Sequence, residues 1–540
     1  MDRRTLITSV PLTAGLVAIG APPARATAGS ERADRAGAEL STTFATLAIE
    51  ESASVVVPSV GDLWPSCWAD DEELYAANGD GRGFGPAPGP DVAINRITGT
   101  VEDGHLTGTR LAVADEVAPV WTGPAFNRKP TGMACIDGVL YVAVQDLAKG
   151  SFDSAPAATI SRSTDHGRTW TWDTSGPMFA DGVFTTIMFL DYGKDYADAP
   201  DEFVYLYGID DNWRQAQDVH LARVPRGHVQ DAQRWQFFTG RRPSGQATWS
   251  NEIDARRPVL HDDTRSYREI FTEQGAHNLL PLAQGAVVYN KPLQRYFLTG
   301  WNAYQWTIYD APTPWGPWGK SVKDFGAAWT LDKHGGYTPT IPSKFISADG
   351  RQMWVQSNVC GPCGAEPKGR YNFNLRRFSV TLADPSPERH QRDGSNLALL
   401  PGAVTVQRCL HFGDANVLFD ESTERSEDDW NNERKDASWW GYTWPRPVRV
   451  NELVYTTGDL FDSGGWFERD LRVQVRRRGG WRDLPAQQVS PSYPYSSEAG
   501  ERTAYRFSFR TAITDGVRII GRPGGEQTFT SISELSVHFR

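Results

Sequence analysis

The sequence predicts an all-β protein in which a five-bladed β-propeller is followed by a smaller β-sandwich. Two observations lead to this fold class. A short hairpin pattern recurs five times within residues 55–381, and the pattern breaks at a polar, proline-rich segment, residues 382–404. Residues 405–540 then carry a new set of strand patterns that is too short and irregular for a second propeller.

Each copy of the hairpin has a strand of small or apolar residues, an acidic or glycine-containing turn and an aromatic-rich strand. The aromatic anchors are 66, 64, 92 and 57 residues apart, and they are Tyr75, Tyr141, Tyr205, Phe297 and Trp354. This spacing suits four-stranded blades with loops of unequal length. Each blade buries one sheet face only by packing on the next, so the five copies predict a closed propeller whose inner strands begin at one central cup.

Composition agrees with this fold. The 540 residues include 20 Trp, 18 Tyr, 24 Phe, 51 Gly and 35 Pro, which predicts short aromatic-rich strands separated by turns. A chain of this length is expected to form at least two cores. The formal net charge of −11 makes the protein a poor polyanion binder, so nucleic acid is not an expected partner.

The first 26 residues predict an export signal of the twin-arginine type. They contain Arg3 and Arg4, an uncharged stretch and a small-x-small cleavage site at Ala24-Arg25-Ala26. A membrane anchor would need roughly 20 apolar residues, whereas two prolines interrupt a shorter apolar core here. Cleavage removes three arginines and one aspartate, so the net charge goes from −11 to −13. We expect a secreted monomer that does not bind membranes, with residues 27–54 as a flexible segment.

The five cysteines cannot all pair with one another. Cys360 and Cys363 have the spacing of a redox motif or of half a zinc site, but no second CxxC or nearby histidine pair completes a metal site. A local disulfide is therefore the favoured interpretation. Cys67, Cys135 and Cys409 are predicted to be buried apolar residues.

The second domain carries a distinctive order of features. An acidic loop containing ANVLFDESTE precedes a Trp-rich strand, LRVQVRRRGGWRDLP follows, and SISELSVHF closes the chain. This order resembles the discoidin or coagulation-factor type C family of galactose-binding-like jelly rolls. The resemblance implies sugar binding and, in some members, a structural calcium ion. Asp414, Asp420 and Asp428 offer hard oxygen ligands, although a solvated acidic loop is the favoured interpretation.

Within the propeller, residues 163–170 read STDHGRTW and match the Asp box, SxDxGxTW, that is familiar from sialidases. In that motif the aspartate, here Asp165, caps a hairpin turn and the tryptophan, here Trp170, packs between strands away from the substrate. The motif therefore supports the propeller and says nothing of sialic acid. A sialidase also needs an arginine triad and a Tyr nucleophile with a Glu partner, and the sequence does not supply a recognisable set.

Two aspartates are the candidate catalytic residues. Asp62, in VGDLW, opens the first inner strand, and Asp80, in NGDG, ends the adjacent antiparallel strand 18 residues later. The start of one antiparallel strand lies beside the end of the next, so both carboxylates are expected at the same rim. Such a pair suits glycoside hydrolysis, with Asp62 as base and Asp80 as acid. The alternative is that Asp80 belongs to a plain turn and Asp62 to a strand cap.

Four segments extend this hypothesis to a family. GDLW with NGDG, LARVPRGHVQD, VVYNKPLQRYFL and DAPTPWGPW resemble the propeller family long catalogued as a domain of unknown function, which includes bacterial endo-D-arabinanases. Where the family has a GDT motif, this chain has Gly79-Asp80-Gly81. The resemblance, over about residues 55–380, implies a glycoside hydrolase. The wider arabinanase and xylosidase clan also has five blades and an acidic site, which implies inversion of configuration.

Further residues are expected to face the cup and bind substrate. The polar candidates are Lys129, Thr131, Asn290 and Lys344, with Asn358 and Asn374 as weaker ones. The aromatic candidates for stacking on sugar rings are Trp64, Trp68 and Trp249, each of which also suits a hydrophobic core.

The sequence thus predicts a secreted glycoside hydrolase that acts on a furanose-rich or other cell-wall polysaccharide. Arabinan and arabinogalactan are the expected substrates, catalysis needs no metal or cofactor, and the second domain holds glycan. The alternative is a lectin-like protein in which both domains bind glycans without cleaving them.

Overall fold

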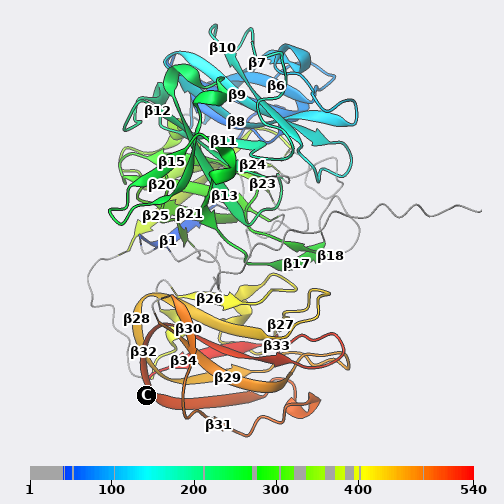
Figure 1. The fold of residues 1–540 in the computed structure, drawn as a ribbon, viewed down its shortest axis with the longest axis vertical. Coiled ribbons are helices and arrows are strands. Elements are labelled where there is room, and N and C mark those ends of the chain that lie inside the picture. The colour runs from blue at the N-terminus through cyan, green and yellow to red at the C-terminus, as the bar shows by residue number, and fades with distance from the viewer. Residues whose placement is uncertain are drawn as a thin grey trace, which may run out of the picture. The chain divides into compact units, whose positions relative to one another are not determined.

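The structure is a computed structural model, and strands dominate it (Figure 1). It describes residues 41, 43–50, 54–102, 104–210, 213–269, 276–302, 306–321, 336–358, 371–383, 394–400, 403–477 and 479–540. The predicted export signal and the Cys360/Cys363 pair lie outside these residues. The helices in the described part are short 3₁₀ turns, and none is long and apolar enough to cross a membrane. The expected all-β class, a propeller followed by a sandwich, is confirmed.

The first two blades occupy residues 60–163. The strands of the first blade are β3 (Val60–Asp62), β4 (Ser66–Trp68), β5 (Leu74–Gly83), β6 (Val92–Thr100) and β7 (His105–Val113). Those of the second are β8 (Phe126–Ile136), β9 (Val139–Ala148) and β10 (Ala157–Ser163). All neighbouring strands within these two sheets are antiparallel.

The third and fourth blades join through their inner strands, β11 and β19, which pair in parallel. The third blade contains β11 (Thr186–Asp191), β12 (Phe203–Ile209), β13 (Asp218–Pro225), β14 (Gln236–Arg241), β15 (Ala247–Ser250) and β16 (Pro258–His261). The fourth contains β19 (Val287–Asn290), β20 (Arg295–Trp301), β21 (Trp306–Ala311) and β22 (Gly319–Ser321). A separate hairpin, β17 (Ser266–Glu269) and β18 (Ala276–Leu279), lies between them in sequence.

The fifth blade is completed by the N-terminal part of the chain. Its strands are β23 (Tyr337–Thr340), β24 (Gln352–Asn358) and β25 (Asn374–Leu382), and β25 also pairs with β1 (Phe44–Ile49) and β2 (Val55–Val56). Figure 1 shows β1 beside β25. Residues 44–49, which we expected in a flexible segment, therefore form an edge strand. Pairing the N-terminal strands with the last blade closes the ring.

The five aromatic anchors confirm the blade pattern, because each lies on the second strand of its blade: β5, β9, β12, β20 and β24. The inner strands are neighbours, with β4 against β8, β8 against β11, and β11 against β19. We call the face where the inner strands begin the cup face, and the face where they end the opposite face. In each blade the hairpin between the first and second strands lies on the opposite face.

The Asp box closes the turn after β10. Asp165 Oδ1 accepts hydrogen bonds from the backbone N–H groups of Arg168 (3.1 Å) and Thr169 (2.9 Å), and the indole of Trp170 is buried and donates to Gly167 O. Burial opposes ionisation, but these bonds and those from the Thr169 and Ser163 hydroxyls lower the pKa of Asp165 to about 2. Asp165 thus caps the turn and Trp170 is buried, as the sequence predicted.

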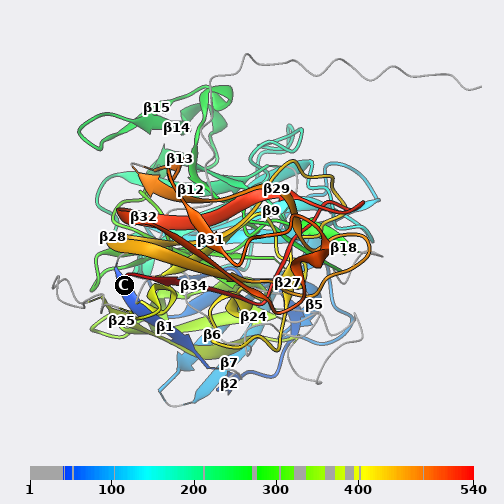
Figure 2. The same cartoon turned by 90° about the horizontal axis from the view of Figure 1, so that it is seen from below.

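The C-terminal domain is a sandwich with its own core. Its main sheet contains β26 (Val404–Gln407), β28 (Ser438–Thr456), β32 (Ala504–Pro523), β29 (Phe467–Arg477), β30 (Gly480–Asp483), β31 (Gln488–Ser490) and β34 (Glu534–His538). A second sheet pairs β27 (Glu427–Asp428) with β33 (Ser531–Ile532). Figure 2 shows β28, β32 and β29 side by side. Leu397, which we placed in the linker, is fully buried in this core.

Short 3₁₀ turns connect many of these strands. They are η1 (Ala114–Glu116), η2 (Lys194–Tyr196), η3 (Arg226–His228), η4 (Ala232–Arg234), η5 (Ile253–Ala255), η7 (Ser343–Phe345), η8 (Leu397–Leu399), η9 (Ala415–Leu418) and η10 (Ser497–Ala499). Cys67, Cys135 and Cys409 are buried thiols, as predicted, and burial raises the pKa of the Cys135 thiol.

Candidate functional site

Asp62 and Asp80 lie on the neighbouring strands β3 and β5, at the cup face of the first blade. Strand β3 pairs with β5 so that Asp62 lies opposite Gly79, the residue before Asp80. A Cβ added at Gly79 would lie 2.5 Å from Asp62 Oδ1 and 3.3 Å from Lys129 Cδ. The side chains of Asp62 and Lys129 therefore occupy the space that a side chain at position 79 would fill.

The glycines of NGDG are explained by the close approach of β3 rather than by a turn. Asp80 lies within β5, with a positive φ of 35°. A Cβ at Gly81 would stand 2.2 Å from the carbonyl oxygen of Val60, which no side chain tolerates. The motif thus brings the backbone of β5 against β3 and presents Asp80 between two residues without side chains.

The two carboxylates have different surroundings. Asp62 is buried, and its Oδ2 accepts a hydrogen bond of 2.8 Å from the hydroxyl of Tyr371. The backbone carbonyl of Tyr371 also accepts a hydrogen bond from Gly61 N–H, so the segment before β25 is fixed beside β3. Nothing in the sequence pointed to Tyr371, because it lies 309 residues from Asp62.

Asp80 pairs with a lysine and opens onto a cleft. Its Oδ2 forms an ion pair with Lys129 Nζ; the lysine side chain is 3% exposed, whereas that of Asp80 is 37% exposed. The cleft has a volume of about 570 Å³ and is lined by Val60, Asp80, Gly81, Arg82, Ala87, Gly89, Pro90 and Asp91. Asp80 is therefore the carboxylate that a ligand in this cleft would meet directly.

A second acidic residue, Asp91, lies on the same cleft. It precedes β6 and accepts hydrogen bonds from the backbone N–H (3.1 Å) and the guanidinium (3.0 Å) of Arg128, the neighbour of Lys129. The sequence analysis missed Asp91. The antiparallel argument that paired Asp62 with Asp80 would have found it, because the start of β6 returns to the rim where β5 ends.

Thr131 and Gln284 are buried polar residues at the inner strand of the second blade. Thr131 is buried, and its hydroxyl lies 3.4 Å from the carbonyl oxygen of Ala143. Gln284, from the fourth blade, donates a 2.9 Å hydrogen bond to the carbonyl of Pro130 in the second blade. This bond links two blades that are not adjacent in the ring, and it holds the backbone just before Thr131.

The predicted aromatic platforms do not line the cup. Trp64 is fully buried, donates to the carbonyl of Gly61 and packs edge-on against Phe84 and Phe373, so it is a core residue. Trp249 lies on β15, the outermost strand of its blade, where it covers the guanidinium of Arg223. Trp68 ends β4 and therefore lies toward the opposite face. Burial places Trp64 in the core, and strand position places Trp68 and Trp249 away from the cup. The sequence did not reveal either property.

Asn290 and Lys344 also lie away from the cup. Asn290 is the last residue of β19 and donates to the carbonyl of Gly350. Lys344 follows β23, donates to the carbonyl of Glu72 and lies 3.8 Å from the carboxylate of Glu73. Inner strands begin at the cup face, so residues at or beyond their ends are carried to the opposite face.

The two weaker candidates support the backbone near the cup. Asn358 is buried and donates to the carbonyls of Asn372 (2.6 Å) and Gly61 (3.5 Å). Asn374 is buried and donates to the carbonyls of Ser357 and Asn372. Both amides fix the chain that carries Tyr371 rather than facing the cleft.

The three calcium candidates do not form one site. Arg425 forms ion pairs with Asp414 and Asp420, whereas Asp428 pairs with His411 at 3.1 Å. The donor set does not fit calcium, because the Arg425 guanidinium already balances two of the three carboxylates. Within the described residues, one group of acidic and imidazole ligands does converge, and it consists of Asp70, Asp71 and His166.

Comparisons with known proteins cover parts of the chain. A family model described as a domain of unknown function (DUF4185) matches residues 113–353, which is less than half of the chain and does not include Asp62 or Asp80. No curated protein matches.

Three solved structures show distant likeness. An exo-β-1,3-galactanase from Phanerochaete chrysosporium is 10% identical, with 90% of this chain and 99% of that chain covered and a TM-score of 0.36. A GH43_1 enzyme from Xanthomonas citri is 11% identical (62% and 92% covered, TM-score 0.33). The family 32 carbohydrate-binding module of C. perfringens NanJ is 13% identical (25% and 93% covered, TM-score 0.21).

Proposed function

We propose that the protein is a glycoside hydrolase whose catalytic carboxylates are Asp62 and Asp80. The observation that carries the proposal is the register of β3 and β5, which sets Asp62 opposite Gly79 and next to Asp80 at the mouth of the innermost strand. Cleavage of a glycosidic bond needs one carboxylic acid to protonate the leaving oxygen and one carboxylate to activate water or to attack carbon. Two carboxyl groups on neighbouring strands, one facing a cleft, meet this requirement.

From their surroundings we infer roles opposite to those expected from sequence. A carboxyl group in a dry position tends to stay protonated, and one beside a cation tends to stay ionised. Asp62 is buried beside a tyrosine hydroxyl, whereas Asp80 is partly exposed and paired with Lys129. We therefore assign the acid to Asp62 and the base or nucleophile to Asp80. Inversion, which needs a water molecule between substrate and base, stays our expectation.

The rest of the cleft suits a small stretch of polysaccharide. Its volume of about 570 Å³ is within the range of ligand sites. Asp80, Arg82 and Asp91 give it both acceptors and a guanidinium donor. Such groups form hydrogen bonds with sugar hydroxyls. The four sequence segments that resemble endo-D-arabinanases favour arabinan or arabinogalactan as substrate. Export by the twin-arginine signal would bring the enzyme to such polymers.

The test is a cleavage screen with matched variants. Mature protein, residues 27–540, is incubated with arabinan, arabinogalactan and xylan, and new reducing ends are measured. Asp62→Asn and Asp80→Asn should each lower turnover by about a hundredfold or more, whereas Asp173→Asn, at an exposed loop position, should not.

Two outcomes would count against the proposal. Full activity in either Asn variant removes this pair from the active site. Retention on a polysaccharide gel without any cleavage favours the lectin-like alternative. The anomeric configuration of the first product, followed by NMR, tests inversion separately.

A further inference from the structure

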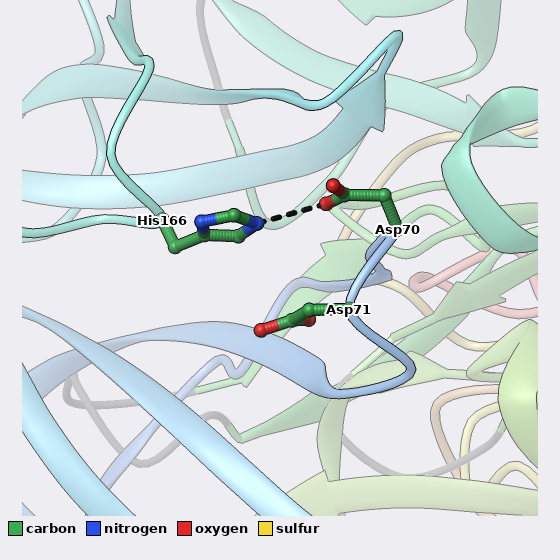
Figure 3. Close-up of side chains that lie close together, drawn as sticks. All are labelled: Asp70, Asp71 and His166. Atoms are coloured by element: carbon green, nitrogen blue, oxygen red, sulfur yellow. Dashed lines mark hydrogen bonds and ion pairs between the residues drawn. The ribbon is translucent and has the colours of Figure 1, made fainter.

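A cluster of three metal-ligating side chains lies on the opposite face, away from the proposed glycosidase site. Asp70 and Asp71 belong to the turn between β4 and β5, and His166 belongs to the Asp box that follows β10. Each offers one ligand atom, and the three atoms lie within 4.8 Å of one another. Figure 3 shows the imidazole and the two carboxylates converging from the first and second blades.

Both turns that carry the cluster are held by their own hydrogen bonds. In the Asp box, Ser163 Oγ accepts from Gly167 N–H (2.9 Å), and Asp165 fixes the residues that follow. The His166 ring lies 6.1 Å from the ring of Tyr75, with a 30° angle between the planes. The Tyr75 hydroxyl in turn donates to Asp71 Oδ2 (2.9 Å). The imidazole and Asp71 are thus positioned through one shared aromatic neighbour.

Charge balance distinguishes Asp70 from the other acids of this turn. Glu72 pairs with Lys194, and Glu73 with Arg96 (3.3 Å) and Lys344 (3.8 Å). Among the described residues, the ion-pair partner of Asp70 is His166, whose Nε2 lies 2.9 Å from Asp70 Oδ1. A metal ion bound between His166 Nε2 and the two carboxylates would be reached by three ligand atoms that already lie within 4.8 Å of one another.

Arg96 is the competitor for one ligand, because its guanidinium lies 3.4 Å from Asp71 Oδ2. It also contacts Glu73, so it keeps a partner if a metal ion takes Asp71. Asp70 is exposed and the other two residues are half-buried, which leaves open coordination positions for water.

From this geometry we propose that Asp70, Asp71 and His166 bind one divalent transition-metal ion of the Zn²⁺ or Co²⁺ type. Imidazole with carboxylates suits these ions, whereas Ca²⁺ and Mg²⁺ prefer sites made of oxygen alone. The ion would join the first blade to the second and so stabilise the propeller on the face away from the cleft. This proposal is independent of the glycosidase activity.

The test measures binding of the metal itself. Mature protein is freed of metal with a chelator and titrated with Co²⁺, whose visible absorption reports coordination, and Zn²⁺ then competes for the site. The variants are His166→Ala and the isosteric Asp70→Asn. The control is His228→Ala, which removes a histidine whose Nδ1 is 3.9 Å from a single carboxylate, that of Asp231.

Wild type and His228→Ala should bind one equivalent and gain thermal stability with Zn²⁺. His166→Ala and Asp70→Asn should bind at least about tenfold more weakly and lose that gain. The melting temperature of Asp70→Asn without metal checks its fold. Equal Co²⁺ affinity in wild type and both variants, or displacement of Co²⁺ by an equal concentration of Ca²⁺, would overturn the proposal and leave Asp70 and His166 as a plain ion pair.

Discussion

The buried side chain of Lys129, at the start of the second blade's inner strand, forms an ion pair with the Asp80 carboxylate of the first blade. The Lys129 side chain is only 3% exposed, so its ammonium group has lost most of its hydration. The ion pair with Asp80 offsets the free-energy cost of burying that charge. The pair therefore fixes the position of Asp80 across a boundary between two blades.

Replacing Lys129 by methionine tests the role of this pair. Lys129→Met keeps most of the side-chain volume but removes the charge, so Asp80 loses its positioning partner and turnover should fall on the order of a hundredfold. Kinetics on the substrate found in the screen measure the effect. Lys149→Met, at an exposed position, is the matched control. Unchanged turnover in a folded Lys129→Met protein would exclude a role for the pair.

Asp165 is expected to matter for stability and not for catalysis. Asp165→Ala removes the acceptor of two backbone N–H groups in the Asp box and should cost about 1 kcal/mol of unfolding free energy, as for other side-chain caps. Chemical denaturation measures the loss. Turnover per folded molecule should stay near that of wild type, and a well-folded but inactive variant would contradict the placement of the proposed active site on the cup face.

The buried carboxylate of Asp262 forms an ion pair of 2.8 Å with the partly buried Lys320 and accepts a hydrogen bond from the hydroxyl of Tyr309. Lys320→Met leaves an uncompensated buried carboxylate and should destabilise the propeller by about 3–5 kcal/mol. Lys320→Arg keeps the charge and should cost less. Urea unfolding at pH 7 compares the three proteins.

The same pair predicts a dependence on pH. Burial alone would raise the pKa of Asp262, but Lys320 holds it below its ordinary value. A lowered pKa contributes stability above the unfolded value of about 3.9, and this contribution is lost as the pH falls further. In Lys320→Met the carboxyl group can protonate to escape its unpaired charge. The difference between wild type and Lys320→Met should therefore shrink at acidic pH, and a constant difference would argue against an ionic origin.

The C-terminal domain should fold alone if it begins early enough. The indole of Trp444 donates a 2.9 Å hydrogen bond to the carbonyl of Leu397, and Leu397 is buried in the sandwich core. A fragment of residues 394–540 should therefore be more stable than one of residues 405–540. Thermal unfolding compares the two, and retention on polysaccharide gels tests glycan binding. Equal melting temperatures of the two fragments would show that residues 394–404 act as a linker and not as part of the domain.

Export is tested on the precursor. Replacing Arg3 and Arg4 by lysine should trap the protein in the cytoplasm, because the twin-arginine route reads the arginine pair. Fractionation followed by immunoblotting measures this, and the mature N-terminus should lie near Ala26. Undiminished export of the lysine variant would point to another route.

Much of the fold was predictable because its signals are local. Each hairpin sets its own turn and strand alternation within some 15–25 residues, so Tyr75, Tyr141 and Tyr205 marked their second strands correctly. The Asp box was equally local, since Asp165 bonds only to residues up to four positions away. The pairing of Asp62 with the Gly79-Asp80 segment followed from one antiparallel hairpin.

The sequence by itself thus determined the number of blades, the hairpin turn capped by Asp165 and the pairing that sets Asp62 opposite Gly79. Only the tertiary structure decided that Asp62 is buried and accepts a hydrogen bond from Tyr371, and that Asp80 forms an ion pair with Lys129. It also decided that Trp64 is core and that Lys344 lies on the opposite face. Burial and ion pairing depend on contacts between blades that are far apart in the sequence. The local pattern of apolar and polar residues does not indicate which side chains will form those contacts.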